Sequence, residues 1–144
     1  MWSRFLISIL LLTLSSCANP FKYAPNNWVK VTEVKGQNPK KIYVDKNRVT
    51  CKDDKCSAWV KMVFDMEEAI QFHGNKAGEV SGTMMVGRVD SSVDYDCKKQ
   101  IALINSYQLY DRTGKLVDSK WVKNEYEYAK EGTIQGDILK YVCK

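Results

Sequence analysis

Short segments in which apolar and polar residues alternate recur along the chain between residues 28 and 122. In the stretch from Ser57 to Phe64, for example, Ala58 and Val60 fall on one face and Lys61 on the other, which is the period of a half-buried strand. The same reasoning predicts strands at residues 28–34, 41–45, 48–50, 57–64, 92–97, 101–110 and 115–122. Polar turns join them, and no helical crossover of the kind that parallel strands need is visible. The pattern predicts a single antiparallel sheet of about six strands.

Two segments depart from this alternation. Residues 65–82 hold an acidic stretch followed by glycines and an asparagine, and we expect a long excursion between strands with at most one helical turn. Near the C-terminus, apolar residues recur at helical spacing, and Thr133 is positioned to cap a helix. The residues on that face are Ile134, Ile138, Tyr141 and Val142. The predicted fold class is therefore α+β, mainly β, with a C-terminal helix packed on the sheet.

The first seventeen residues have the pattern of an export signal. Arg4 precedes an apolar run from Phe5 to Leu14, which has the length of a signal-peptide core and is too short to span a membrane. The tetrapeptide from Leu14 to Cys17 resembles the lipobox of bacterial lipoproteins, and this resemblance implies cleavage before Cys17 and its lipidation with palmitate-type acyl chains. The alternative is an ordinary signal peptide in which Cys17 is incidental.

These features divide the chain into a signal peptide at residues 1–16, a lipidated N-terminus and tether at 17–27, and a domain at 28–144. By resemblance to enterobacterial lipoproteins, Ala18 after the cysteine indicates the outer membrane. We therefore expect a lipid-anchored protein of the cell outer membrane, on its surface or its periplasmic face. The lipid anchor would make the membrane its first partner.

Charge adds one restriction. Removal of residues 1–16 leaves 128 residues, enough for one domain, and lowers the formal net charge from +5 to +4. This mild positive balance suits anionic headgroups, polysaccharides or acidic proteins, and export argues against a nucleic-acid partner.

Four cysteines remain after Cys17, and an even number in an oxidising compartment indicates two disulfides with three conceivable pairings. Cys51 and Cys56 flank a polar loop between strand-like segments, so a local bridge is the natural pairing. This pairing leaves Cys97 and Cys143, whose bridge would hold the C-terminal helix to the sheet. The alternative, a four-thiolate zinc site, has unusual spacing for that metal.

The order of several weak motifs resembles the surface-adhesin protein E family of Gram-negative lipoproteins. The motifs are residues 27–31 (NWVKV), 43–45 (YVD), 58–61 (AWVK), 95–99 (YDCKK), a turn at 110–114, and the ending 137–143 (DILKYVC). The resemblance implies an antiparallel sheet with a disulfide-held C-terminal helix. It also implies adhesion to vitronectin and laminin, haem binding and a homodimer. The family's ligand residues cannot be placed here, and the Cys51–Cys56 pair and residues 65–82 depart from its pattern.

A basic, aromatic patch is the main candidate for ligand binding. Its residues are Lys40, Lys41, Lys98, Lys99, Tyr43 and Tyr95. The alternative is that these lysines are solvated sheet edges that discourage aggregation. We interpret Trp28 and Trp59 as packing residues, and the acidic pairs 53–54 and 67–68 as solvated turns rather than calcium sites.

Nothing in the sequence predicts an enzyme. His73 is the only histidine and no partner for catalysis can be placed beside it, so we expect a solvated loop residue. We predict no catalytic residues, no metal and no cofactor, with haem suggested by resemblance alone. The expected function is an adhesin-like envelope protein that contacts a host or environmental macromolecule. The alternative is a periplasm-facing structural or assembly lipoprotein.

Overall fold

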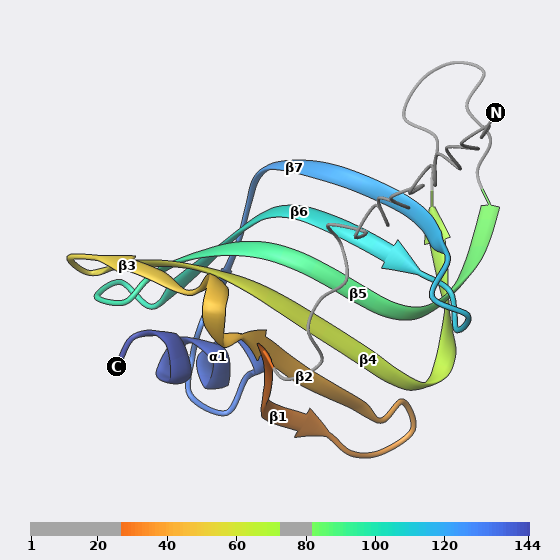
Figure 1. Cartoon of the computed structure of the whole chain (residues 1–144), viewed down its shortest axis with the longest axis horizontal. Coiled ribbons are helices and arrows are strands. Elements are labelled where there is room, and N and C mark those ends of the chain that lie inside the picture. The colour runs from red at the N-terminus through yellow and green to blue at the C-terminus, as the bar shows by residue number, and fades with distance from the viewer. Residues whose placement is uncertain (1–26, 73–81) are drawn as a thin grey trace, which may run out of the picture.

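A computed structural model describes residues 27–72 and 82–144 of the chain (Figure 1). The predicted signal peptide, the lipidation site Cys17, most of the tether and His73 lie outside the described residues. The described elements are β1 (Trp28–Val34), β2 (Lys40–Asp45), β3 (Thr50–Lys52), β4 (Lys55–Phe72), β5 (Gly82–Asp96), β6 (Ile101–Tyr110), β7 (Leu116–Tyr128) and α1 (Ile134–Val142). A 3₁₀ turn, η2 (Lys46–Arg48), precedes β3.

All the described strands belong to one antiparallel sheet in the order β1-β2-β4-β5-β6-β7, and β3 pairs with β4 off this path. The predicted fold class is confirmed, with seven strands in the described residues rather than about six. The strand predicted at residues 48–50 is shifted: residues 46–48 form η2, and β3 begins at Thr50 and forms a hairpin with β4. Asp53 in its turn has φ 53°, a left-handed conformation that Asp tolerates better than most residues.

The predicted excursion at residues 65–82 is wrong for its first part, because β4 continues to Phe72 and pairs with β5 from Gly82. The alternation fails there because the two strands change register. Four residues of β4 between Val63 and Glu68 face only Gly87 of β5. Such a bulge interrupts the two-residue period without ending the strand, which explains why the sequence resembles a loop.

One face of the sheet is covered by α1. The buried core on this face comes from alternate strand residues and from the helix: Ile42, Val44, Cys56, Ala58, Val60, Val93, Tyr95, Ala102, Ile104, Ile138 and Val142. The helix contacts both edge strands, β1 and β7, so the sheet curves around it. The opposite face, which we call the outer face, carries the other half of each strand pattern.

The helix is fixed at both ends. At its start, Thr133 Oγ1 accepts a hydrogen bond from the Gly136 amide at 3.0 Å, as expected of an N-cap. Gly136 lies so close to the Lys130 carbonyl that a Cβ there would collide with it. At its end, Cys143 is bonded to Cys97. The predicted helix and its attachment to the sheet are thus confirmed.

The second predicted disulfide, Cys51–Cys56, is also present. The two cysteines are directly opposite each other in the β3–β4 ladder. The bond therefore holds β3 against the first residues of β4.

Candidate binding groove

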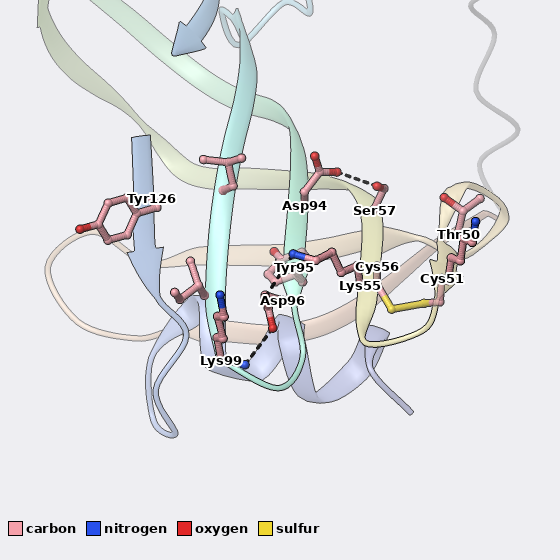
Figure 2. Close-up of a pocket in the computed structure, with 13 residues that line it drawn as sticks. Thr50, Cys51, Lys55, Cys56, Ser57, Asp94, Tyr95, Asp96, Lys99 and Tyr126 are labelled. Carbon is pink, nitrogen blue, oxygen red and sulfur yellow. Dashed lines mark hydrogen bonds and ion pairs between the residues drawn. A yellow bond between two sulfur atoms is a disulfide. The ribbon is translucent and has the colours of Figure 1, made fainter. Parts of the chain in front are cut away.

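A groove of about 630 Å³ lies beside the β3 hairpin, at the end of the sheet where the β5–β6 turn is found (Figure 2). Its volume is within the range of small-ligand sites. Residues of five strands and one turn line it: Thr50, Cys51, Lys52, Lys55, Cys56, Ser57, Asp94, Tyr95, Asp96, Lys99, Ile101, Leu103 and Tyr126.

Strand register explains why these residues meet. Ser57, Asp94, Leu103 and Tyr126 are paired in one row across β4, β5, β6 and β7. Since alternate residues of a strand share a face, the next outer-face row lies two residues along and includes Ile101. The groove is therefore formed by the alignment of β4, β5, β6 and β7 together with the β3 hairpin, and no single segment contains it.

The floor of the groove is apolar and accessible. Leu103 is 37% exposed and Tyr126 is 58% exposed, and the two side chains are paired across β6 and β7, so they present adjoining apolar area to solvent. Tyr128 packs edge-on against Tyr126 with ring centroids 6.0 Å apart, and Lys130 Nζ lies 5.8 Å from the Tyr128 ring centroid. The aromatic surface thus continues along the edge strand β7, from Tyr126 in the groove to Tyr128 beyond it.

The carboxylates in the groove are already hydrogen-bonded to protein groups. Asp94 accepts from Ser57 Oγ at 2.6 Å and from Asn105 Nδ2 at 3.0 Å. Asp96 accepts from the Lys99 amide at 2.8 Å and from Lys55 Nζ at 3.2 Å. The hydrogen bond from the Lys99 amide, followed by that from Lys55, lowers the pKa of Asp96, so its carboxylate stays ionised and occupied.

The lysines that line the groove form fewer interactions with protein groups than its carboxylates do. Lys55 pairs with Asp96, but neither Lys52 nor Lys99 forms an ion pair with a described residue. Both side chains belong to exposed residues. The groove consequently combines an apolar floor with cationic groups that are available to an acidic ligand.

The predicted basic, aromatic patch does not exist as a single surface. Lys41 is paired with Val63 of β4. Lys98 and Lys99 lie in the turn after Asp96, and Asp96 is paired with Lys55 of β4, eight residues before Val63. At about 3.4 Å per residue this separates the two lysine pairs by roughly 27 Å. Lys99 lines the groove and Lys98 does not.

The remaining members of that patch are accounted for by other contacts. Lys40 lies 5.4 Å from the Phe64 ring centroid, and Lys41 is 3.7 Å from Asp65. Tyr95 is 1% exposed, and its hydroxyl donates to Gln135 of α1 at 2.9 Å, so it belongs to the core. Tyr95 is two residues after Val93 and therefore shares its buried face of β5. This alternation in the sequence already indicates a core residue and not a member of the patch.

Tyr43 belongs to a second group on the outer face. There Lys61 Nζ lies 4.3 Å from the Trp28 ring centroid and 5.1 Å from that of Tyr43, while Arg48 lies 4.5 Å from the Trp59 ring centroid. Burial lowers the pKa of Lys61. Cations thus cover the aromatic faces, which agrees with the interpretation of Trp28 and Trp59 as packing residues.

Metal binding has little support among the described residues. The one group of clustered metal-ligand atoms found there consists of Cys56, Cys97 and Cys143, and all three are in disulfides. Of the acidic pair at 67–68, Glu67 accepts a hydrogen bond from the Arg112 amide at 2.9 Å. No helix in the described part of the chain has the length and apolar composition needed to cross a membrane.

A single curved antiparallel sheet, a disulfide-held C-terminal helix and an open groove define a small binding domain. The model of the family described as surface-adhesin protein E matches residues 28–144, and the chain belongs to this family. Comparison with curated proteins gave no match. Membership indicates an adhesin-like protein of the cell surface with a non-enzymatic role.

Proposed function

We propose that the chain is a lipid-anchored binding protein of the cell envelope, and that its groove contacts an acidic region of a host or environmental macromolecule. The observation that carries this proposal is the groove itself, where an apolar floor adjoins lysines whose acidic neighbours are already hydrogen-bonded. Family membership supports adhesion as the general role.

The anchor is supported by the N-terminal sequence. The lipobox-like tetrapeptide ends at Cys17, and the residues between it and β1 form a tether that would reach about 30 Å when extended. Lipidation would hold the domain within that distance of a membrane. A partner must then either be part of the envelope or approach it from outside.

The physical basis of recognition is a division of roles within the groove. Exposed Leu103 and Tyr126 offer apolar area that a partner can remove from water, which supplies most of the affinity. Lys52 and Lys99 favour an acidic partner and speed its approach, and salt should weaken this contribution.

Two neighbouring lysines provide a matched test. Lys98 and Lys99 occupy the same turn and are both exposed, but only Lys99 lines the groove. We expect Lys99→Glu to weaken binding about tenfold, equivalent to about 1.4 kcal/mol, because it places a carboxylate beside an acidic ligand. Lys98→Glu should change binding much less. Binding of the full chain, purified in mild detergent, would be measured on immobilised vitronectin and laminin.

Equal effects of the two substitutions would contradict the proposal that the groove is the binding site. They would indicate that the partner is attracted to the positive charge of the protein in general. A salt series distinguishes these results further. In the wild-type protein binding should fall as sodium chloride rises, and the Lys99→Glu variant should show a smaller dependence.

A further inference from the structure

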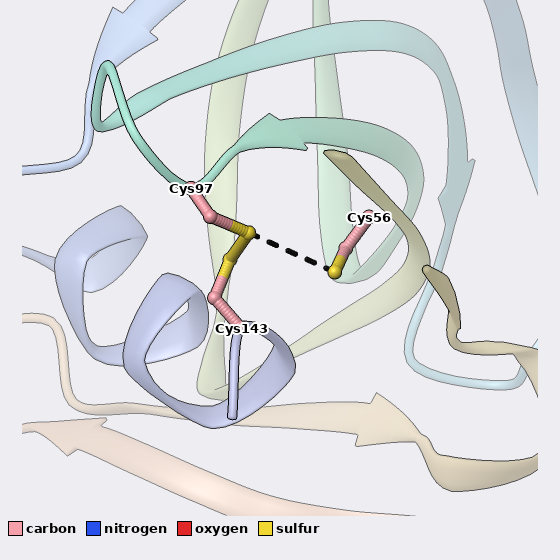
Figure 3. A group of neighbouring side chains, drawn as sticks. All are labelled: Cys56, Cys97 and Cys143. Carbon is pink, nitrogen blue, oxygen red and sulfur yellow. Dashed lines mark hydrogen bonds between the residues drawn. A yellow bond between two sulfur atoms is a disulfide. The ribbon is translucent and has the colours of Figure 1, made fainter. Parts of the chain in front are cut away.

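The two disulfides are in contact with each other. Cys56 Sγ, which is bonded to Cys51, lies 3.7 Å from Cys97 Sγ, which is bonded to Cys143 (Figure 3). The sulfur atoms of Cys56, Cys97 and Cys143 all lie within 4.8 Å of one another. To form a bond, the Cys56 and Cys97 sulfur atoms must approach by about 1.7 Å, and the Cys97–Cys143 bond must turn, because its angle to Cys56 Sγ is at most about 110° and exchange proceeds in line.

The members of the group differ in accessibility. Cys51 is exposed in the β3 hairpin, whereas Cys56 is 4% exposed. Both of their sulfur atoms lie 3.4 Å from the carbonyl oxygen of Val142, so this disulfide packs on the last turn of α1. Cys51 is therefore the more exposed half of this disulfide toward a thiol arriving from solvent, while Cys56 lies beside the second disulfide.

We infer that the four cysteines form a thiol–disulfide exchange site, with Cys51 as its entry and Cys56 as its internal nucleophile. The substrate is an external thiol in its thiolate form. The thiolate attacks Cys51 Sγ, a mixed disulfide forms, and the Cys51–Cys56 bond breaks with its electron pair on Cys56. The first step thus generates a thiolate beside the second disulfide.

In the second step the Cys56 thiolate attacks Cys97 Sγ. A Cys56–Cys97 bond forms, the Cys97–Cys143 bond breaks, and the electron pair passes to Cys143, which takes a proton from water. The number of disulfides is unchanged through both steps, so the external thiol is the only co-reactant. The exchange releases Cys143, and with it the C-terminal end of α1, from the sheet.

The position of Cys97 favours this rearrangement. It is the first residue after β5, and its amide donates to the Asp54 carbonyl at 2.8 Å, so it lies beside the β3–β4 turn. Cys97 lies outside the ladder, whose last pair is Lys55 with Asp96, so it can both approach and turn without breaking strand pairing. This inference does not depend on the groove binding a ligand.

Two single substitutions test the inference because each leaves one different free thiol among the four cysteines of the domain, and peptide mapping follows Cys17 separately. Cys51→Ser leaves Cys56 beside the second disulfide, and Cys56→Ser leaves Cys51, which lies outside the group of mutually close sulfur atoms. Each full chain would be held without oxygen at about pH 8, where a free thiol is partly ionised. Alkylation and peptide mapping would then identify the free thiols and bonded pairs.

For Cys51→Ser we expect alkylation to be divided between Cys56 and Cys143, together with a Cys56–Cys97 linked peptide. Its yield should exceed that of any Cys51–Cys97 peptide from Cys56→Ser on the order of tenfold, because proximity favours Cys56. Alkylation of Cys56 alone, with Cys97–Cys143 intact, would overturn the inference. So would equal rearrangement in both variants.

The wild-type chain offers a second measurement in case a variant fails to fold. With limiting reduced glutathione, we expect glutathione on Cys51, alkylation on Cys143, and a Cys56–Cys97 linked peptide. If glutathione reduces Cys51–Cys56 and the thiol of Cys56 persists while Cys97–Cys143 stays closed, no exchange occurs and the inference is wrong.

Discussion

Asp90 is a charged residue in an unusual place. It is 3% exposed on the outer face of β5, with Oδ1 3.1 Å from Arg88 Nε. Burial raises the pKa of Asp90, and attraction to Arg88 and then Lys61 only partly offsets this effect. The folded protein therefore holds the ionised carboxylate less well than the unfolded chain does.

The sign of the shift gives a prediction for stability. Because the folded-state pKa is raised, the ionised carboxylate costs stability above that pKa, and the cost disappears as pH falls toward the unfolded value. We expect Asp90→Asn to be more stable than wild type at neutral pH, and this difference to shrink on acidification. Urea unfolding across a pH series measures it.

Asp96→Asn is the opposite-sign control. The pKa of Asp96 is lowered, chiefly by the hydrogen bond from the Lys99 amide, so its charge contributes stability above the unfolded pKa. This substitution should destabilise the protein at neutral pH, and the loss should vanish as pH falls through the folded pKa. If both variants shift stability in the same direction, the assignment of the two environments is wrong.

At the scale of elements, the two disulfides restrain different lengths of chain. Cys97 and Cys143 are 46 positions apart and join α1 to the sheet, whereas Cys51 and Cys56 are only 5 apart within one hairpin. Closing a longer loop removes more entropy from the unfolded chain. The long-range disulfide should therefore dominate stability.

Paired substitutions test this ranking without leaving a free thiol among the four cysteines of the domain. We expect Cys97→Ser with Cys143→Ser to lower the free energy of unfolding by about 4 kcal/mol, and Cys51→Ser with Cys56→Ser by about 2 kcal/mol. Urea unfolding followed by tryptophan fluorescence would measure both. A larger loss from the hairpin pair would show that its packing on Val142, and not loop closure, governs its contribution.

The elements differ in how well the sequence predicts them. The bounds of β1 and β6 and the capped helix α1 could be read from the sequence, because polar turn residues flank both strands and Thr133 marks the start of the helix. The far ends of β4 and β5 could not, because the bulge opposite Gly87 reverses the phase of the alternation. A local pattern cannot reveal a register shift that depends on the partner strand.

At the scale of the whole molecule, the sheet separates two roles. Its curved inner face packs on α1 and holds the core, while the outer face keeps a groove open beside the β3 hairpin (Figures 1 and 2). The sequence predicts the inner face, since burial leaves a repeating pattern. It predicts the groove poorly, because Ser57, Leu103 and Tyr126 meet only through the register of several strands.

The central claim is that a macromolecular partner occupies this groove. Photo-crosslinking on intact cells tests it most directly, with a photoreactive residue at Leu103 in the groove or at Val117, an exposed apolar position of β7 outside it. We predict that the Leu103 probe captures a discrete partner from matrix extract and that the Val117 probe does not. Equal capture at both positions, or capture at Val117 alone, would contradict the claim.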